Sequence, residues 1–156
     1  MERIILGIDP GTAVMGFGVL LVKETKVFLL EADAIRFPAE DDHTLKLRAI
    51  FRHVLRIIEK HHPDELAIEA QFFGKNVQSM LKLGRAQGVA IAAALHRELA
   101  VTEYAPRRVK QSVTGNGNAT KEQVAAMLLN ILGVATLPQS TDATDAIAVA
   151  VCHHFS

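Results

Sequence analysis

The sequence predicts an α/β protein with a five-stranded mixed sheet and helices on both faces. Three strand-like segments open the chain, and the apolar spacing then changes to the period of a helix. Short apolar runs afterwards alternate with helical segments, which gives the order βββαβαβααα. This order describes an antiparallel meander followed by crossover connections. With 156 residues and 49% hydrophobic content, the chain is expected to form a single domain over residues 1–156.

The first half of the chain is expected to supply four strands and one helix. Residues 3–9 are an almost unbroken apolar run that ends in an acid, as in a strand buried on both faces. Residues 14–22 read as a second strand, and the alternation of residues 27–35 predicts a half-solvated third. Residues 47–58 place apolar side chains on one helical face, and residues 66–69 form a short fourth strand.

The second half is expected to supply one strand and four helices. A long helix is predicted over residues 77–95, a strand over 101–104 and a short helix from Pro106. Residues 120–123 (Thr-Lys-Glu-Gln) are a capping-box pattern that starts a further helix. Residues 141–154 form the closing helix.

The long helix contains two glycines that need an explanation. Gly84 and Gly88 each cost up to ~1 kcal/mol relative to alanine, and close approach of another backbone usually offsets that cost. They share one face with apolar residues, namely Val77, Met80, Leu81, Ile91, Ala92 and Leu95. Two alternatives stay open: the face meets its symmetry mate in an isologous homodimer, or it packs tightly on the sheet of its own subunit.

Composition excludes several classes of protein. One cysteine rules out a disulfide framework and a cysteine zinc cluster, and it fits a reducing compartment. No run approaches the ~20 apolar residues of a membrane span, and no signal peptide is visible at the N-terminus. A soluble cytoplasmic domain with no membrane partner is expected.

The net charge of zero hides an uneven distribution. From residue 71 to 121 there are eight Lys and Arg against two Glu, a net charge of +6, so the remainder carries −6. Such a basic block can steer a polyanion. The alternative is a set of solvated helix faces.

Four carboxylates are expected to converge. Asp9 and Glu69 end two strands that plausibly pair, and ligands of α/β sheets bind at the carboxyl ends of strands. Asp142 and Asp145 share one face in the first turn of the closing helix. Each acid alone could simply form a turn, end a strand or cap a helix. The hypothesis of a site depends on three distant segments meeting at one edge.

Clustered carboxylates require a cation. Two like charges about 4 Å apart repel by ~4 kcal/mol at an effective dielectric constant of 20. Ligation by oxygen alone selects Mg²⁺, for which Mn²⁺ can substitute, rather than Zn²⁺. Two such ions roughly 3.5–4 Å apart form the arrangement that hydrolyses phosphodiesters. The pattern therefore predicts a hydrolytic nuclease with two Mg²⁺ per active site.

Five motifs follow one another through nearly the whole chain, namely Ile8-Asp9-Pro10-Gly11-Thr12, Ala67-Ile68-Glu69, Lys82-Leu83-Gly84-Arg85-Ala86-Gln87-Gly88-Val89-Ala90, Val109-Lys110-Gln111 and Asp142-Ala143-Thr144-Asp145-Ala146. Together they closely resemble the motifs of the RuvC-type Holliday junction resolvases. The resemblance implies an RNase H-like fold, a homodimer, and Mg²⁺-dependent symmetric nicking of four-way DNA junctions in recombination and repair. It also implies action with the RuvA–RuvB branch-migration complex.

The resemblance assigns roles by position. The four acids match catalytic metal ligands, Lys110 and Lys121 match basic residues near the scissile phosphate, and Phe72 matches an aromatic residue that stacks on a junction base. Two departures are visible. The chain ends soon after Phe155 without the basic tail that some members carry, and some members have histidine at the position of Asp142.

Further residues are candidates for contact with DNA. Phe72, Phe73 and Lys75 follow the acid-bearing fourth strand directly, and base stacking is worth ~1–3 kcal/mol per base. Either phenylalanine could instead fill the core. Arg85 belongs to the basic block, and Lys121 follows the cap of a helix whose N-terminus attracts phosphate, although it could be a solvated lysine.

The histidines and the cysteine have modest expected roles. The adjacent pairs at 61–62 and 153–154 are interpreted as surface or helix-end groups rather than ligands, with His153 or His154 a weak candidate proton carrier near the metals. Cys152 is expected to be a small buried hydrophobe.

Two other functions compete with the nuclease. A strand followed by Asp-Pro-Gly-Thr also resembles the phosphate loop of sugar kinases and actin-like ATPases, but those proteins need two such domains. A non-catalytic scaffold that binds junctions on the same fold is the other alternative. A binder gains nothing from four acids that face DNA.

Overall fold

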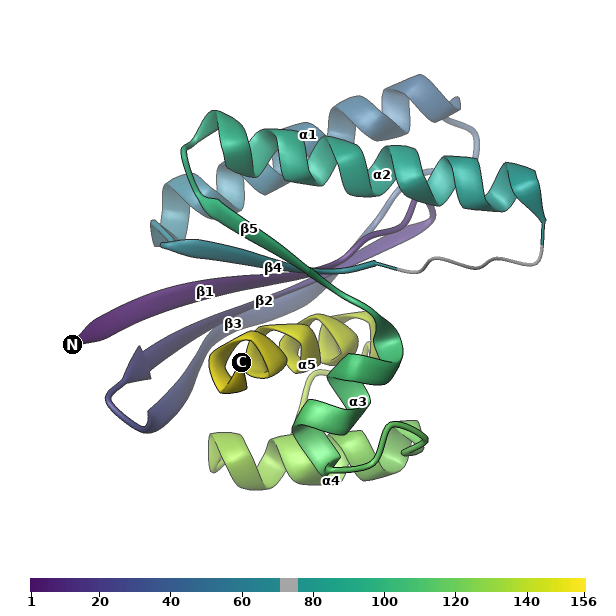
Figure 1. Ribbon diagram of the computed structural model, residues 1–156. Helices are drawn as coiled ribbons and strands as arrows, with labels where there is room; N and C mark the ends of the chain where they lie inside the picture. Colours follow the sequence, from purple (N-terminus) through teal and green to yellow (C-terminus); the bar gives the residue numbers. More distant parts are fainter. Residues whose placement is uncertain (71–75) are drawn as a thin grey trace.

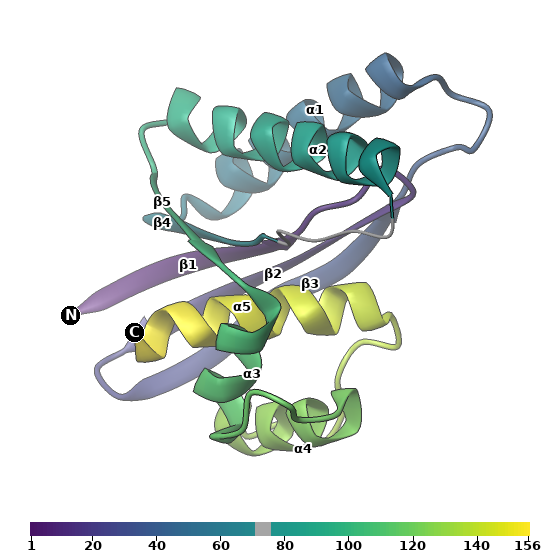
Figure 2. The same ribbon diagram turned by 45° about the vertical axis from the view of Figure 1, so that its right-hand side comes forward.

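The computed structural model describes residues 1–70 and 76–156, which form three layers. A central sheet carries two helices on one face and three on the other (Figure 1). The elements are β1 (Glu2–Asp9), β2 (Val14–Lys23), β3 (Lys26–Arg36), α1 (His43–His61), β4 (Glu65–Glu69), α2 (Val77–His96), β5 (Ala100–Tyr104), α3 (Pro106–Thr114), α4 (Lys121–Leu132) and α5 (Thr141–Phe155). Helices α1 and α2 cover one face, and α3, α4 and α5 the other (Figure 2).

The sheet has the predicted mixed topology. Its strand order is β3-β2-β1-β4-β5, with β1–β2 and β2–β3 antiparallel and β1–β4 and β4–β5 parallel. The predicted α/β class, the five strands and the element order are thus confirmed. Strand β1 lies where the meander meets the crossover connections, so β1 and β4 end at the same edge.

Side-chain caps fix where the helices begin. Helix α1 starts at His43, earlier than the apolar period predicts, because the Asp42 carboxylate accepts the backbone N–H of Leu45. At α4 the predicted capping box is formed, since the Thr120 side chain accepts from the Gln123 backbone and the Gln123 side chain accepts in return.

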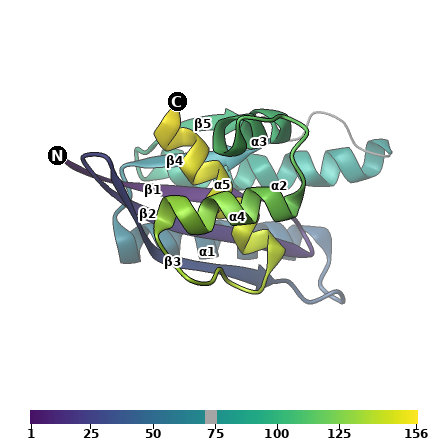
Figure 3. The ribbon, with the colours of Figure 1, turned by 90° about the horizontal axis from the view of Figure 1, so that it is seen from below.

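Helix α5 lies unusually close to the sheet. It crosses the lower face between α4 and strands β1 and β2 (Figure 3). A Cβ added at Gly7 would lie 2.2 Å from the carbonyl oxygen of Ala146, and one at Gly16 would lie 1.9 Å from that of Asp142. Only a residue without a side chain allows this approach. The first turn of α5 is thereby held against the edge where β1 ends.

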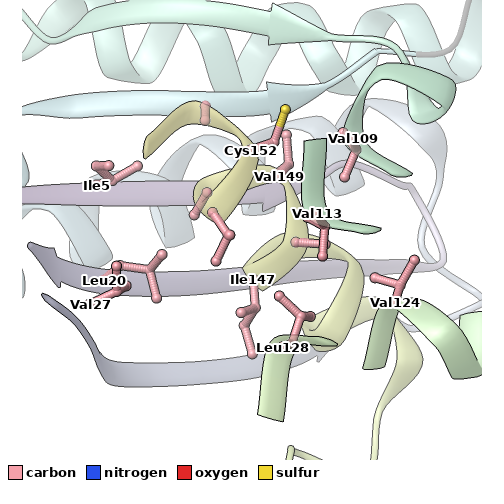
Figure 4. Packing of buried hydrophobic residues seen from close by; sticks show 14 of the residues in the cluster. Ile5, Leu20, Val27, Val109, Val113, Val124, Leu128, Ile147, Val149 and Cys152 are labelled. Carbon is pink, nitrogen blue, oxygen red and sulfur yellow. The ribbon is translucent and has the colours of Figure 1, made fainter. Parts of the chain in front are cut away.

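Two hydrophobic cores flank the sheet. The core beneath α5 joins Ile5 and Leu20 of the sheet to Ile147 of α5 and Leu128 of α4 (Figure 4). Cys152 is fully buried in this core, as expected. The second core lies under α1 and α2. At ~25 cal/mol per Å² of apolar surface, such burial is the main stabilising contribution to the fold.

Helix α2 turns a different face to the core than its apolar pattern suggests. Its buried residues are alanines, namely Ala86, Ala90, Ala93 and Ala94. A Cβ added at Gly84 or Gly88 would meet nothing within 4 Å. The alternative that these glycines pack on the sheet of their own subunit is therefore wrong.

No helix in the described ranges 1–70 and 76–156 has the length and apolar character needed to cross a membrane.

Candidate active site

Four carboxylates from three elements face one edge of the sheet. Asp9 is the last residue of β1 and Glu69 the last residue of β4, and these strands are parallel neighbours. Asp142 and Asp145 lie in the first turns of α5. Asp9 pairs in register with Gly16, whose missing side chain admits the Asp142 backbone. The close approach at Gly16 therefore joins the helical acids to the strand acids.

The electrostatics show that these acids interact. The pKa of Asp9 is raised from 3.8 to about 8, first by burial and then by the charges of Glu69, Asp145 and Asp142. Burial also raises the pKa of Asp145, to which the charge of Asp142 adds. Lys121 opposes both shifts. Mutual repulsion and desolvation thus make full ionisation of this group costly without a cation.

The donor set fits a hard divalent cation. All four side chains offer carboxylate oxygens, the ligands that Mg²⁺ and Mn²⁺ prefer. Across residues 1–70 and 76–156, no three His, Cys, Asp or Glu side chains already stand at the spacing of a closed metal cluster. The charges of the other three acids raise the pKa of Asp9, so the acids lie close enough to repel one another, but their oxygens do not yet surround a single point. A divalent cation supplies the charge that would draw the oxygens together.

Basic residues border the acids on one side. The Lys121 ammonium lies 3.8 Å from an Asp145 carboxylate oxygen, at the N-terminus of α4. Lys110 of α3 also lowers the pKa of Asp145. A cavity of about 410 Å³ between α3, α4 and α5 is lined by both lysines together with Glu69 and Asp145. The positive potential of the α4 N-terminus adds to that of the lysines, so a phosphate can enter beside the acids.

Other predicted residues lie elsewhere. Phe72, Phe73 and Lys75 fall outside the described residues. Arg85 is exposed on α2, and it is not among the groups that shift the pKa of Asp9 or Asp145. The structure therefore brings together the four acids and the two lysines, but it does not join Arg85 to them.

Gln87, which supports the position of Glu69, was not identified from the sequence. The Gln87 amide donates to the backbone carbonyl of Glu69 at 3.4 Å, which ties α2 to the end of β4. Gln87 lies inside a segment that carries the family resemblance, so a signal was present. Its partner was not predictable, because the contact joins residues on separate elements.

The closing histidines correct an expectation. His153 is at a helix end, as expected, but it is not on the surface, since its side chain is 12% exposed. Its ring bonds the Tyr104 hydroxyl at 2.7 Å and also Glu65. His153 and His154 lie in the last turn of α5, whereas the acids lie at its start. The hypothesis that either carries protons at the metals is wrong.

The fold and the site define a class: divalent-metal nucleases on an RNase H-like sheet, with acids at the carboxyl ends of neighbouring strands. The family model "Crossover junction endodeoxyribonuclease RuvC" matches residues 5–153. The chain belongs to the RuvC family.

Relatives and solved structures agree with this assignment. The chain is 58% identical to the crossover junction endodeoxyribonuclease RuvC of Cytophaga hutchinsonii, over 99% of this chain and 78% of the relative. It is 56% identical to that of Porphyromonas gingivalis, over 99% and 82%. The structure of T. thermophilus RuvC in complex with Holliday junction substrate superposes with a TM-score of 0.92 at 34% identity, over 98% and 93% of the two chains. The yeast mitochondrial resolvase Ydc2, at 12% identity, covers 97% and 77% with a TM-score of 0.72 and shares the fold.

Proposed function

We propose that this chain is a divalent-metal-dependent endonuclease that resolves four-way DNA junctions by symmetric paired nicks. The observation that carries the proposal is the gathering of Asp9, Glu69, Asp142 and Asp145 at one edge, with the pKa of Asp9 raised to about 8 by burial and by the other three acids. A fold gains nothing from this concentration of buried charge unless a cation neutralises it. Support for the substrate comes from the T. thermophilus relative, whose structure contains a Holliday junction.

The four acids would hold two Mg²⁺, and Mn²⁺ can substitute. Bound there, two ions would supply the activation of water and the stabilisation of the leaving oxygen that phosphodiester hydrolysis needs. The chain itself positions the ligands through the ends of β1 and β4 and the first turns of α5. Asp9 must give up its proton before it can ligate, because its raised pKa leaves the carboxyl protonated near neutral pH.

Lys110 and Lys121 are proposed to hold the scissile strand. They line the cavity beside the acids, and Lys121 stands at the N-terminus of a twelve-residue helix. Each lysine neutralises phosphate charge close to the carboxylates, where negative charge would otherwise repel the backbone. We assign Phe72, Phe73 and Lys75 to junction contacts on their place in the sequence after Glu69, and Arg85 to the surrounding basic surface.

Two nicks at symmetric positions require two active sites, which supports a homodimer. Helix α2 offers the matching surface, because Val77, Leu81 and Leu95 are 71%, 53% and 56% exposed. Between them Gly84 and Gly88 open onto empty space. Exposed apolar side chains around small residues suit the close contact of two equivalent helices. A second copy of the chain is therefore the proposed occupant of this face.

The cellular setting follows from the same proposal. A junction resolvase works on recombining DNA, which supports the expected cytoplasmic location and cooperation with a RuvA–RuvB branch-migration complex. Co-purification of the chain with RuvA–RuvB on a synthetic junction checks the second point. If the affinity of this chain for the junction is the same with and without RuvA–RuvB, and the proteins do not co-purify, the proposed cooperation is contradicted.

The decisive assay compares cleavage of a synthetic four-way junction with cleavage of linear duplex in Mg²⁺. The wild-type chain is expected to nick the junction in pairs and to leave duplex intact. Asp9→Asn should abolish cleavage while junction binding persists, and Asp33→Asn, on the exposed side of β3, is the matched control. Binding without cleavage by the wild type would identify a scaffold instead. Normal cutting by Asp9→Asn would overturn the metal assignment.

A further inference from the structure

Helix α1 carries a basic surface that the proposed active site does not use. Between His43 and His61 it has five Lys and Arg and one Glu, a net charge of +4 in a chain whose total is zero. Arg48, Arg52 and Arg56 recur at every fourth residue and are exposed. The buried residues of the helix, among them Ile50 and Val54, lie on its opposite side. We call these three arginines the arginine ridge.

The ridge lacks the neutralisation that other charges near it have. Lys60 on the same helix pairs with Glu31, and Glu59 pairs with Arg97. In the described part of the chain, no ion pair reaches an arginine of the ridge. Like charges four residues apart destabilise a helix, and only part of this cost is offset, by the charge of Asp42 near Arg48 and by the contact of Arg56 with the His53 ring at 3.4 Å.

The surface around the ridge is hollowed. A depression of about 410 Å³ is lined by the ridge together with Asp41, Leu45, Ala49 and His53. Asp41 is the one carboxylate of this lining, and the nearby Asp42 caps the helix through Leu45 and Thr44. Three guanidinium groups around one depression are suited to an extended anion that can bond several of them.

The ridge starts at the end of the sheet that carries the acids. Arg36 at the end of β3 pairs with Val14, which follows Asp9 through a short turn. The Phe37 amide donates to the Ala13 carbonyl at 3.0 Å, and α1 begins a few residues later. Helix α1 then runs back along the sheet from that end (Figure 1). A polymer that leaves the acid-bearing edge can therefore follow the ridge.

The spacing of the ridge matches a DNA strand. Residues four apart on a helix are separated by about 6 Å along its axis. Alternate phosphates of one DNA strand are separated by ~7 Å along the duplex axis. We propose that the arginine ridge binds the phosphate backbone of one duplex arm as that arm leaves the active site. This inference rests on the proposed junction-resolving function. DNA is favoured over an acidic protein because the ridge begins at the acid-bearing end of the sheet, where the proposed function places DNA.

Arm length makes the proposal testable. Arg52 and Arg56 lie about 14 and 20 Å along the helix from the start of α1, so hairpin-closed arms of ~4 base pairs, which span about 14 Å from the junction centre, do not extend past Arg52. Arms of ~20 base pairs pass it. Junction binding is measured in EDTA, without cleavage, over a range of salt concentrations. The variant is Arg52→Gln/Arg56→Gln, and Lys23→Gln/Lys60→Gln removes the same charge from lysines that are already paired with Glu2 and Glu31.

On long arms, Arg52→Gln/Arg56→Gln should lower the slope of log affinity against log salt by about 2 and weaken binding roughly tenfold at ~50 mM salt. On short arms it should bind and, in Mg²⁺, cleave like the wild type, which also shows that it is folded. The lysine control should match the wild type on both. An unchanged slope on long arms, as expected if the ridge serves an acidic protein, would overturn the proposal, and so would an equal loss on short arms. Failure of the wild type to cleave any junction would instead count against the proposed function.

Discussion

Asp9→Asn is predicted to stabilise the fold in the absence of metal, although it abolishes the proposed activity. Burial and three neighbouring acids raise the pKa of Asp9 to about 8, whereas in the unfolded chain it returns to about 3.8. A folded-state pKa above the unfolded one gives stability that is complete below pH ~4 and is lost as the pH rises towards 8. The metal-free wild type should therefore lose stability across that window.

The size of the effect follows from the same two values. At pH 7 about three pH units separate the solution from the unfolded pKa of 3.8, and each unit corresponds to ~1.4 kcal/mol, so the cost is roughly 4 kcal/mol. Asparagine has the same shape and no charge. The substitution should recover up to that amount at pH 7, and nearly nothing at pH 4.

Urea unfolding in EDTA at pH 4, 5.5, 7 and 8 measures this difference. The free energy of unfolding should separate steadily in favour of Asp9→Asn as the pH rises, while Asp33→Asn follows the wild type. Saturating Mg²⁺ should reverse the order at pH 7, because only the wild type gains the stabilisation of a bound ligand. Equal stabilities of wild type and Asp9→Asn at pH 7 and pH 4 would refute the view that Asp9 is held in a repulsive, desolvated group.

Three further substitutions test other parts of the account. Gly16→Ala places a Cβ 1.9 Å from the Asp142 carbonyl oxygen, so it should displace α5 and lower Mg²⁺-dependent cleavage at least ~10-fold. Gly84→Ala is the control, because a Cβ there meets nothing within 4 Å, and it should keep the activity per proposed dimer. Cleavage like the wild type by Gly16→Ala would disprove the positioning role. Lys121→Ala should slow cleavage and reduce the salt slope of junction binding by about 1, and an unchanged slope would mean that Lys121 does not contact phosphate. Leu81→Glu should convert the proposed dimer to monomer in sedimentation experiments, and a persistent dimer would place the interface elsewhere.

Much of the fold was predictable because local signals agreed with the global arrangement. The strands that end in Asp9 and Glu69 were visible as short apolar runs, and the carboxyl ends of parallel neighbours necessarily meet at one edge. The capping box at Thr120 fixed the start of α4. The meeting of Asp9 and Glu69 at one edge could therefore be inferred from the sequence.

Other features depended on contacts that periodicity does not encode. An apolar stripe on α2 predicts burial but does not say whether the covering surface belongs to the same subunit, and the alanines around Ala90 turned out to face the core. The approach of α5 at Gly16 and the burial of His153 against Tyr104 join residues more than forty positions apart. Only the packed structure reveals such pairs.

Anomalous diffraction from crystals grown with Mn²⁺ tests most directly whether the acids form a metal site. Two peaks roughly 3.5–4 Å apart are expected, each within bonding distance of carboxylate oxygens of Asp9, Glu69, Asp142 or Asp145. Peaks bound to other side chains, or no peak at this edge at saturating Mn²⁺, would contradict the account.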